Sequence, residues 1–474
     1  MPKTKIRFQA LGKSCSEVTQ SMYLITAFQK NILLDFGLYQ GVDIVESYKI
    51  NAKRCGSIKP TKIDYIIISH SNIDHCGALP YLYAHGCTAP IYVAKGNKDI
   101  MYLMFCDSQK IFNSDCIRLN KQAHLRAKPL YTKHDIDKCM DYILERDFNS
   151  PFSLCNGIMC EFTSAHHIIA AAQIDLLFID DKHCVKRIHY TGDIGSPYID
   201  KQYVLPFEPP RQCDLLIAEA TYAGEKRNHK PRDRAKDLEK ITALVDKVCV
   251  EKKGKLIFPV FALDRLQTML TVLYDLYGKD PTFNLPVYID TPLGISLCDI
   301  WARCISCDID KWERVINWNA IKYVTSATQS MELQHSDQPM IVLASSGMCT
   351  HGRVVAWVKT ALPKSEYHIC FCGYSAEETI ATKIKNSKRN KYLKIENKFY
   401  IKRCGITVLN SFSSHACASE LLDIYSNAKY ERIVLVHGDY QNKLSFGKEL
   451  QEVLSRNNRT SKVVVIGSDD GFYI

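Results

Sequence analysis

The residues best suited to chemistry follow directly after one apolar run of the chain. Residues 63–68 (IDYIII) have the β-branched pattern of a buried strand, and His70, Asn72, Asp74 and His75 come within the next few residues. Imidazole and carboxylate groups gathered at a strand end can converge on one or two metal ions. An isolated histidine is usually a packing or surface residue, but this group as a whole indicates metal chemistry.

Further ligand-type residues end other apolar runs, at widely separated positions in the chain. They are Asp35 after NILL, His166 and His167 after CEFTSA, Asp193 after HYTG, Glu219 after DLLIA, and His437 after IVLV. Any one of them alone could be an ordinary turn residue. Strands alternate with amphipathic helices along much of the chain, which predicts an α/β fold with a parallel sheet.

Composition limits the classes of protein to consider. The chain has 474 residues, 46% hydrophobic and 24% charged, which predicts a sizeable core and two or more domains. A net charge of +10 favours a polyanionic partner without requiring one. No apolar run is long enough for a membrane span or a signal peptide, and the 20 cysteines are scattered singly. We therefore expect a cytoplasmic protein with unpaired thiols and no membrane partner.

In their order, these segments resemble the motifs of the metallo-β-lactamase fold. Residues 70–75 resemble His-x-His-x-Asp-His, with Asn72 where the second histidine belongs. His167 takes the ligand position of a Gly-His-x-x-Gly-Ala motif, with His166 and Ala170 in place of the two glycines. His166 is either a bystander or a partial substitute for the missing histidine, and we favour the bystander. Thr191-Gly192-Asp193 resembles the motif whose aspartate bridges two metals.

Later segments resemble one branch of this fold, the β-CASP nucleases. The resemblance is carried by IAEATY at 217–222, PVFALDRLQ with Asp264 in place of a glycine, LASSGMCTHGRV at 343–354, SSHAC with Cys417 in place of an aspartate, and VHGD at 436–439. It implies an α/β metallo-β-lactamase αββα sandwich with an inserted α/β β-CASP domain. The expected boundaries are 1–207 and 396–474 for the two parts of the sandwich, and 208–395 for the insert.

The resemblance also implies roles for individual residues. One metal would be held by Asp74, His75, Asp193 and His437, and the other by His70, Asn72, His167 and Asp193, with Asp35 supporting the ligands from behind. Because an amide oxygen is a weaker ligand for zinc than imidazole, we expect two Zn²⁺ sites, one of them weakened, with Mn²⁺ as an alternative. Asp74 would also orient the attacking water, and His415, held by Glu219, would protonate the leaving oxygen.

Two regions could bind phosphate. Ser345, Ser346 and Gly347 offer consecutive N–H groups and hydroxyls to an anion, and Arg353 could add a bidentate contact; a purely structural turn is the alternative. The basic run that begins at Lys226 and ends at Arg234 could bind phosphate or simply face water.

The function that the resemblance implies is a metal-dependent ribonuclease, in which a metal-bound hydroxide hydrolyses phosphodiester bonds of single-stranded RNA. Five departures from the family pattern leave open a catalytically weakened or inactive homologue that binds RNA or acts as a scaffold subunit; they are Asn72, His166, Ala170, Asp264 and Cys417. A small-ester or thioester hydrolase is a weaker alternative. A homodimer or a partner subunit is also possible. The choice between endo- and exonuclease is not encoded in these motifs.

Overall fold

The computed structural model describes residues 5–41, 43–122, 125–224, 232–305, 308–373, 375–376 and 379–474, and the chain folds into two compact units. The first unit comprises residues 1–229, 304–307 and 414–474. The second unit comprises residues 230–303 and 308–413. Each unit has its own sheets and its own hydrophobic core.

The first unit is built on two sheets, each of seven strands within the described residues. Sheet A has the order β22 (Gly471–Tyr473), β1 (Arg7–Ala10), β2 (Met22–Ala27), β3 (Lys30–Phe36), β4 (Tyr65–Ile68), β5 (Ile91–Ala94) and β6 (Ile143–Arg146). Sheet B has the order β21 (Lys462–Val465), β20 (Tyr430–Val436), β11 (Cys213–Glu219), β10 (Val185–Tyr190), β9 (Ala172–Ile179), β8 (Ile158–Ser164) and β7 (Phe152–Cys155).

Alternation along the strands explains why the two sheets pack face to face. Ile67 of β4 lies in one core cluster with Ile217 of β11 and Val434 of β20, so these side chains fill the space between the sheets. The neighbouring residues Leu216 and Leu435 lie in a different cluster on the other face of sheet B. Successive strand residues point to opposite faces, and both faces of these strands are buried here.

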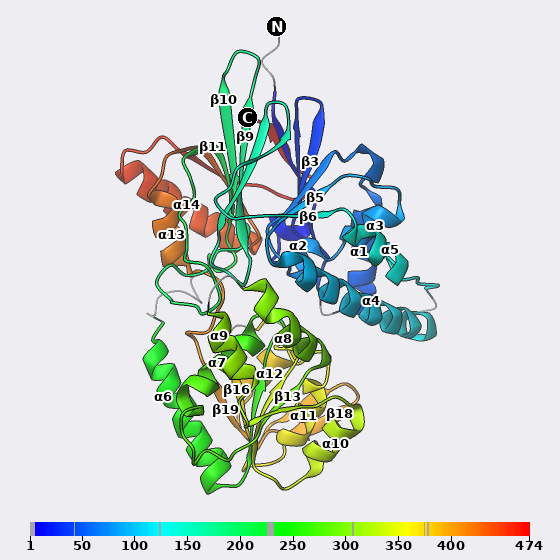
Figure 1. Ribbon diagram of the computed structural model, residues 1–474, viewed down its shortest axis with the longest axis vertical. Helices are drawn as coiled ribbons and strands as arrows, with labels where there is room; N and C mark the ends of the chain where they lie inside the picture. The colour runs from blue at the N-terminus through cyan, green and yellow to red at the C-terminus, as the bar shows by residue number, and fades with distance from the viewer. Residues whose placement is uncertain are drawn as a thin grey trace. The chain divides into compact units, whose positions relative to one another are not determined.

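Helices cover the outer faces of both sheets, which completes four layers in the first unit (Figure 1). The helices on the sheet A side are α1 (Ile44–Gly56), α2 (Ile73–Cys76), α3 (Leu79–Ala84), α4 (Asn97–Gln122) and α5 (Lys133–Met140). Sheet B is covered by α13 (Ala418–Ser426) and α14 (Tyr440–Arg456). This is the αββα arrangement that the sequence predicts.

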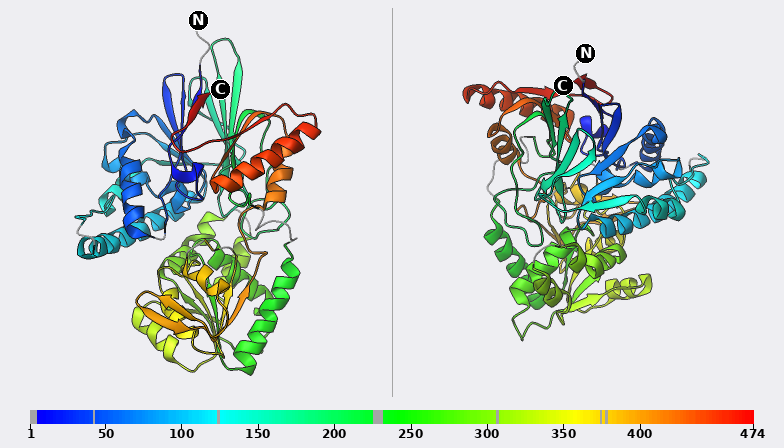
Figure 2. Two further views of the ribbon diagram at one scale, coloured as in Figure 1. Left: turned by 180° about the vertical axis from the view of Figure 1, so that it is seen from behind. Right: turned by 45° about the horizontal axis from the view of Figure 1, so that its top comes forward.

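The second unit has a parallel sheet with helices on both faces (Figure 2). Its strand order is β14 (Ile321–Tyr323), β13 (Val287–Asp290), β15 (Met340–Ala344), β12 (Lys255–Pro259), β16 (His368–Phe371) and β19 (Gly405–Val408). Its helices are α6 (Arg234–Leu244), the π-helix Val245–Glu251, α7 (Arg265–Tyr277), α8 (Pro292–Cys304), α9 (Ile309–Ile316), α10 (Ala327–His335), α11 (Val354–Ala361) and α12 (Ile380–Asn386). A hairpin of β17 (Tyr392–Ile395) and β18 (Lys398–Ile401) packs against its core.

The structure places two strands in a different unit from the one that the sequence indicates. Strand β11, expected in the insert that begins at residue 208, pairs in parallel with β10 and β20 of the first unit. Strand β19, expected after the insert ends at residue 395, pairs with β16 of the second unit. A short buried strand has the same apolar pattern in either sheet, so its partner cannot be read from local sequence.

The described residues bear on two expectations from the sequence, one about membrane-spanning helices and one about the cysteines. Among the described residues no helix combines the length and the hydropathy needed to cross a membrane. Apart from Cys304, the cysteines that the structure describes are free thiols, and most of them are buried. Cys304 is buried as well, and Cys307, three residues later, lies outside the described residues.

Candidate metal centre

Several candidate ligands of the first unit stand where strands end. Parallel β3 and β4 deliver Asp35 and His70 to one edge of sheet A. Parallel β10, β11 and β20 deliver Asp193, Glu219 and His437 to one edge of sheet B. Because the carboxyl ends of parallel strands share an edge, residues separated by hundreds of positions meet here.

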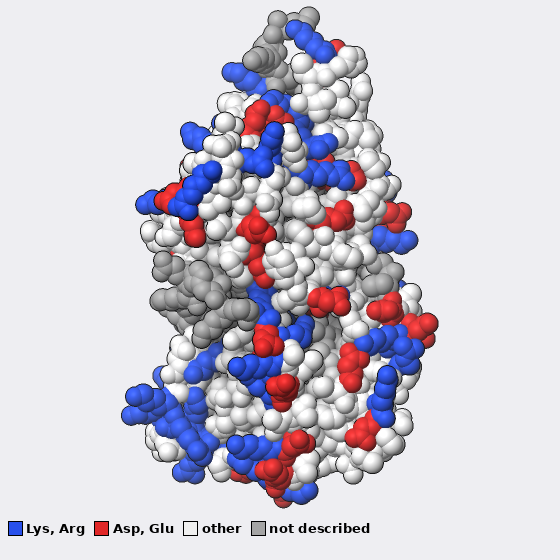
Figure 3. All heavy atoms as spheres, turned by 90° about the vertical axis from the view of Figure 1, so that its left-hand side faces the viewer, with Lys and Arg blue, Asp and Glu red and all other residues white. Residues whose placement is uncertain are grey.

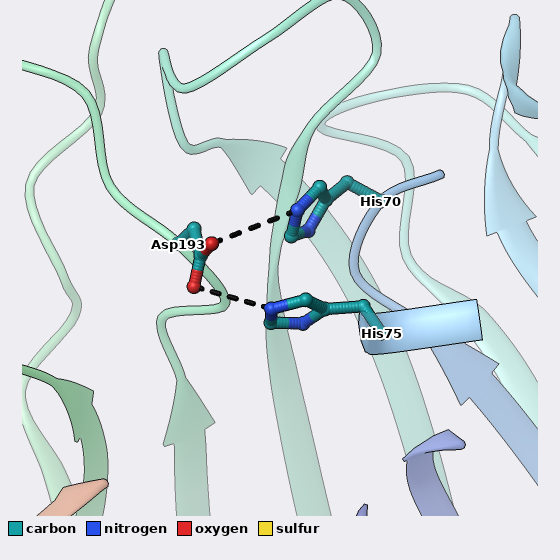
Figure 4. Close-up of side chains that lie close together, drawn as sticks. All are labelled: His70, His75 and Asp193. Carbon is teal, nitrogen blue, oxygen red and sulfur yellow. Dashed lines mark ion pairs between the residues drawn. The ribbon is translucent and has the colours of Figure 1, made fainter. Parts of the chain in front are cut away.

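Asp193 is the centre of this group, and Figure 4 shows its carboxylate facing His70 and His75. Its Oδ2 lies 3.7 Å from His70 Nε2 and 3.8 Å from His167 Nε2. Its Oδ1 lies 3.4 Å from His75 Nε2 and 3.2 Å from His437 Nδ1. The carboxylate therefore presents each of its two oxygens to a different pair of imidazoles, and all five side chains are almost completely buried.

The hydrogen bonds behind the imidazoles fix which nitrogen faces the centre unprotonated. Ser69 Oγ–H donates to Asp35, so the hydroxyl oxygen accepts from His70 Nδ1–H at 3.0 Å. His167 Nδ1–H donates to the carbonyl oxygen of Ser414. In a neutral imidazole the other nitrogen then carries a lone pair. Lone pairs on both Nε2 atoms thus face a carboxylate oxygen that has no proton to donate.

A bound cation would satisfy the nitrogen and oxygen acceptors that face one another here without a proton between them. Within the described residues, the Nε2 atoms of His70, His75 and His167 and Oδ1 of Asp193 are buried without a hydrogen-bond partner. Two ligands held about 2.1 Å from one tetrahedral ion lie about 3.4 Å apart, close to the separations measured here. Imidazole nitrogen and carboxylate oxygen are the donors that zinc uses. The residues present therefore fit a divalent metal ion.

The charges of the site fit the same conclusion. Burial, with a smaller contribution from His75, lowers the pKa of His70 to about 3, and burial also holds the pKa of His167 well below its ordinary value. These two rings stay neutral at physiological pH and are available as ligands. Burial alone would lower the pKa of His75, but Asp193 and Asp35 outweigh it and raise that pKa. The carboxylates of Asp193 and Asp35 therefore favour a positive charge at the centre.

Asp35 holds the centre from behind. Its Oδ2 lies 2.7 Å from His75 Nδ1 and accepts hydrogen bonds from Ser69 Oγ and from the Tyr190 hydroxyl, and its Oδ1 accepts from Ser69 N–H. These contacts orient the His75 ring so that Nε2 points to Asp193. Outer partners of this kind hold a ligand ring in place and raise its basicity.

Asp74 and His437 form the other side of the centre. Asp74 lies on α2 and its Oδ2 is 3.4 Å from His437 Nε2. Burial would raise the pKa of Asp74, but the hydrogen bond from His437 and the charge of His75 lower it. Gly37 lets α2 come close, because a Cβ on residue 37 would sit 1.7 Å from the Asp74 carbonyl oxygen. Asp74, His75 and His437 form one group with ligand atoms close enough to share an ion.

His415 and Glu219 meet as the sequence predicts. His415 Nδ1 lies 3.5 Å from Glu219 Oε1, and it is also 4.0 Å from Asp193 Oδ2. Glu219 is fixed in turn by the backbone N–H groups of Ile194 and Thr221. The His415 side chain is 19% exposed, unlike the buried histidines around it. Its position thus combines access from solvent with contact to the buried centre.

Asn72 and His166 behave differently from the other candidates. Asn72 is half-buried and stands directly before α2, and its side chain does not cap that helix. His166 is turned to the carbonyl oxygens of Leu205 at 2.7 Å and Ile199 at 2.8 Å. Those contacts support the interpretation of His166 as a bystander.

Three of the departures from the family pattern occupy backbone positions that favour glycine. His166, Ala170 and Asp264 stand where the resemblance places glycines, and their φ angles are 53°, 55° and 69°. L-residues other than glycine adopt this region at a cost of about 1 kcal/mol or more. The chain has therefore kept the backbone conformation of the motif while losing the residue best suited to it.

The predicted phosphate loop of the second unit needs correction. The guanidinium of Arg353 lies 2.6 Å from Asp290 Oδ1 and also donates to the Val324 carbonyl, so it serves the fold rather than a free phosphate contact. Ser345 Oγ donates to Thr291, and Ser346 N–H donates to the His351 carbonyl. Much of the expected anion-binding capacity is thus used internally. Most of the basic run from Lys226 to Arg234 lies outside the described residues.

Sequence reasoning missed Lys201, which ties two loops of the centre together. Its Nζ donates to the carbonyl oxygens of His166 at 2.7 Å, His167 at 2.8 Å and Ser414 at 2.7 Å. One ammonium group therefore holds the loop of His167 against the loop of His415. Because its partners are backbone carbonyls, no side-chain motif could have revealed the role.

Comparisons with known proteins agree with this centre. A model of the metallo-β-lactamase superfamily matches residues 16–138, a Beta-Casp domain model matches 266–384, and a model described as a Zn-dependent metallo-hydrolase RNA specificity domain matches 401–460. The three models follow one another in the order that the motifs predict. The chain belongs to the β-CASP branch of the metallo-β-lactamase-fold nucleases. Membership of this branch of metal-dependent hydrolases confirms the predicted family and implies a metal cofactor.

The matches to individual relatives cover nearly the whole of this chain. Ribonuclease TTHA0252 of Thermus thermophilus is 26% identical over 92% of this chain and 94% of its own length. Transcription termination factor FttA of Methanothermobacter thermautotrophicus is 26% identical over 96% of this chain and 69% of its own length. Integrator complex subunit 11 of Danio rerio is 26% identical over 95% of this chain and 71% of its own length.

One solved structure shows the same fold at low sequence identity. A crystal structure of a protein of unknown function from Enterococcus faecalis aligns with a TM-score of 0.52 at 11% identity, over 99% of this chain and 100% of that one. The likeness supports the architecture of the β-CASP chain and carries no information on its substrate.

Proposed function

We propose that this protein is a metal-dependent ribonuclease that hydrolyses phosphodiester bonds of single-stranded RNA. The observation that carries the proposal is the convergence of His70, His75, His167 and His437 on Asp193, with the unprotonated Nε2 atoms of His70 and His167 facing its Oδ2. The names of the relatives and of the RNA specificity domain favour RNA as the substrate. Lys and Arg side chains also gather at the lower left of the face drawn in Figure 3, which suits a polyanion.

Two ions would be held, with Asp193 contributing to both. Asp74, His75 and His437, which form one group, would complete the first position. His70 and His167, which both face Asp193 Oδ2, would hold the second, with Asn72 as the weak donor that the resemblance implies. His415 lies in one group with His167 and Asp193, so it borders the second position directly. Zinc suits the imidazoles, and manganese would tolerate the amide oxygen of Asn72 better than zinc does.

The protein's own groups supply positioning and proton transfer. Bound divalent ions neutralise phosphate charge and lower the pKa of water. Asp74, which carries a lowered pKa and is therefore ionised, accepts a hydrogen bond from the attacking water and orients it. His415, oriented by Glu219 and partly open to solvent, donates a proton to the leaving oxygen.

Cleavage of a labelled single-stranded RNA in the presence of zinc or manganese tests the proposal. The wild-type protein should cleave, and Asp74→Ala should lose at least about 100-fold in kcat while keeping its fold. A matched control is Asp64→Ala, since Asp64 lies in the same unit but pairs with Lys30 instead of the histidines. RNA binding without cleavage under either metal would reject the enzyme and favour a scaffold subunit that has lost activity.

A further inference from the structure

The hairpin of β17 and β18 in the second unit exposes aromatic side chains in a way that the core does not require. Tyr392 and Phe399 are each 67% exposed, the largest exposure of any aromatic side chain in that unit among the described residues. Large rings cost free energy when left in water, so such exposure on a folded surface indicates a binding role.

The register of the hairpin places both rings on one face. Tyr392 is paired with Ile401, and Lys394 with Phe399, and side chains of paired residues share a face. Tyr392 and Phe399 are then diagonal neighbours, with Cα atoms about 7–8 Å apart. The opposite face of the hairpin, with Leu393, Ile395 and Tyr400, packs against the core of the unit. The outward rings are therefore held on a rigid support but take no part in the core.

Positive charge is concentrated in this segment of the chain. The exposed cations of the segment 383–403 include Lys388, Arg389, Lys391, Lys394, Lys398 and Arg403. Glu396 is the only acidic residue of that segment, and its carboxylate already pairs with Lys359 at 2.7 Å. Two further lysines are used by the fold, because Lys385 Nζ donates to the Gly373 carbonyl and Lys402 Nζ to the Ile384 carbonyl. Lys394, paired with Phe399, shares the face of the two rings, and the other exposed cations lie in the hairpin or close to it in the sequence.

We propose that this hairpin face is a platform for single-stranded RNA, separate from the metal centre. Two bases stack on Tyr392 and Phe399, and the lysines and arginines around them contact the intervening phosphates. A duplex would hide its bases from the rings, and a protein partner would not require cations of one sign, so single-stranded nucleic acid fits best. The inference extends the proposed function, since it assumes that RNA is the polymer that the protein meets.

Fluorescence anisotropy with a labelled 20-nucleotide uridine RNA tests the platform directly. Asp74→Ala serves as the background, so that the RNA stays intact. Because one stacked base contributes about 5-fold or more to affinity, Y392A/F399A should weaken binding about 25-fold or more. The control Tyr473→Ala removes a ring that is 57% exposed and lies beneath Lys5, but in the first unit, and it should leave binding unchanged. Equal affinity of the hairpin variant and the control would overturn the platform.

Two further measurements separate stacking from charge. Y392F/F399Y keeps both rings and should bind as tightly as the parent, whereas a loss as large as that of the alanine variant would overturn stacking. Lys394→Gln should reduce the slope of log affinity against log salt by about 0.7, because one phosphate contact on the face of the rings is lost. Lys322→Gln, an exposed lysine of β14 in the same unit, should leave the slope unchanged; an equal effect of the two variants would mean diffuse charge and not a platform.

Cleavage assays distinguish failure of the platform from failure of the nuclease. On the 20-nucleotide RNA, Y392A/F399A should raise KM by about the same factor as it weakens binding, and should leave kcat unchanged. The rate of cleavage of a dinucleotide should not change. A wild-type protein that binds RNA through the hairpin but cleaves none would reject the nuclease and keep the platform. A wild-type protein that cleaves RNA, with a hairpin variant of unchanged KM, would reject only the platform.

Discussion

Replacing Lys201 by methionine removes the ammonium group that joins the two loops of the centre while keeping an unbranched side chain that reaches as far as Cε. Three hydrogen bonds from a charged donor are lost, to the carbonyl oxygens of His166, His167 and Ser414. Such bonds contribute about 1.5–3 kcal/mol each when fully buried. Because Lys201 is only half-buried, water can replace part of them, and we expect a loss of about 2–4 kcal/mol in the free energy of unfolding.

The larger effect should appear in catalysis. His167 and His415 are held by the same ammonium, and a shift of about 1 Å in either group costs about 100-fold in rate. We therefore expect kcat of Lys201→Met on RNA to fall about 100-fold, with KM changed by less than about three-fold. The assay is steady-state cleavage at a temperature where urea titration shows the variant to be fully folded.

Lys138→Met is the matched control for this experiment. Lys138 is also half-buried in the first unit and donates to one backbone carbonyl, that of Tyr83 at 3.0 Å, in the helix layer outside sheet A. It should lose about 1 kcal/mol of stability and no activity. If Lys201→Met keeps the wild-type kcat, or if both variants lose kcat in proportion to their lost stability, the positioning role of Lys201 is refuted.

Three other predictions concern the backbone, the thiols and the departure at residue 72. Ala170→Gly should raise the free energy of unfolding by about 0.5–1 kcal/mol, because the φ angle of Ala170 is 55°. Ala171→Gly, at an ordinary φ angle, should lower the free energy of unfolding by a similar amount, so urea unfolding should show changes of opposite sign for the two variants. Burial raises the pKa of Cys55 from 9.0 to about 12, so the unfolded chain loses this proton first. Cys55 should therefore contribute about 1.4 kcal/mol per pH unit to the fall in stability between pH 9 and 12, and the measured fall should be shallower by that amount in Cys55→Ala. Asn72→His should raise zinc occupancy and cleavage with zinc, and unchanged occupancy would show that residue 72 is not a ligand.

The sequence predicts the fold well because the buried strands and their terminal polar residues are local features. His70, Asp74 and His75 lie within one short segment, so their types and spacing are sufficient to indicate a metal site. Asp193 and His437 could be added only through the order of the motifs, since a lone acid or histidine after a strand has many ordinary explanations. The structure brings these residues together, while their individual roles as ligands stay predictions.

Other features depend on contacts that local sequence does not encode. The partner of β11 is decided by pairing with β20, more than two hundred residues later. Arg353 looks like a phosphate ligand until Asp290 is seen beside it. Lys201 has backbone partners, which carry no residue identity. The outward face of the β17–β18 hairpin follows from its register, and a shift of one residue would bury both rings.

Metal analysis of the purified protein tests the central claim most directly. After exposure to zinc or manganese and removal of free ions, wild-type protein should retain at least about one ion per chain, and Asp193→Ala should retain far less, with circular dichroism showing both to be folded. Asp193 is the common neighbour of four imidazoles, so its loss should empty the centre. A folded Asp193→Ala protein that retains as much metal as the wild type would contradict the account.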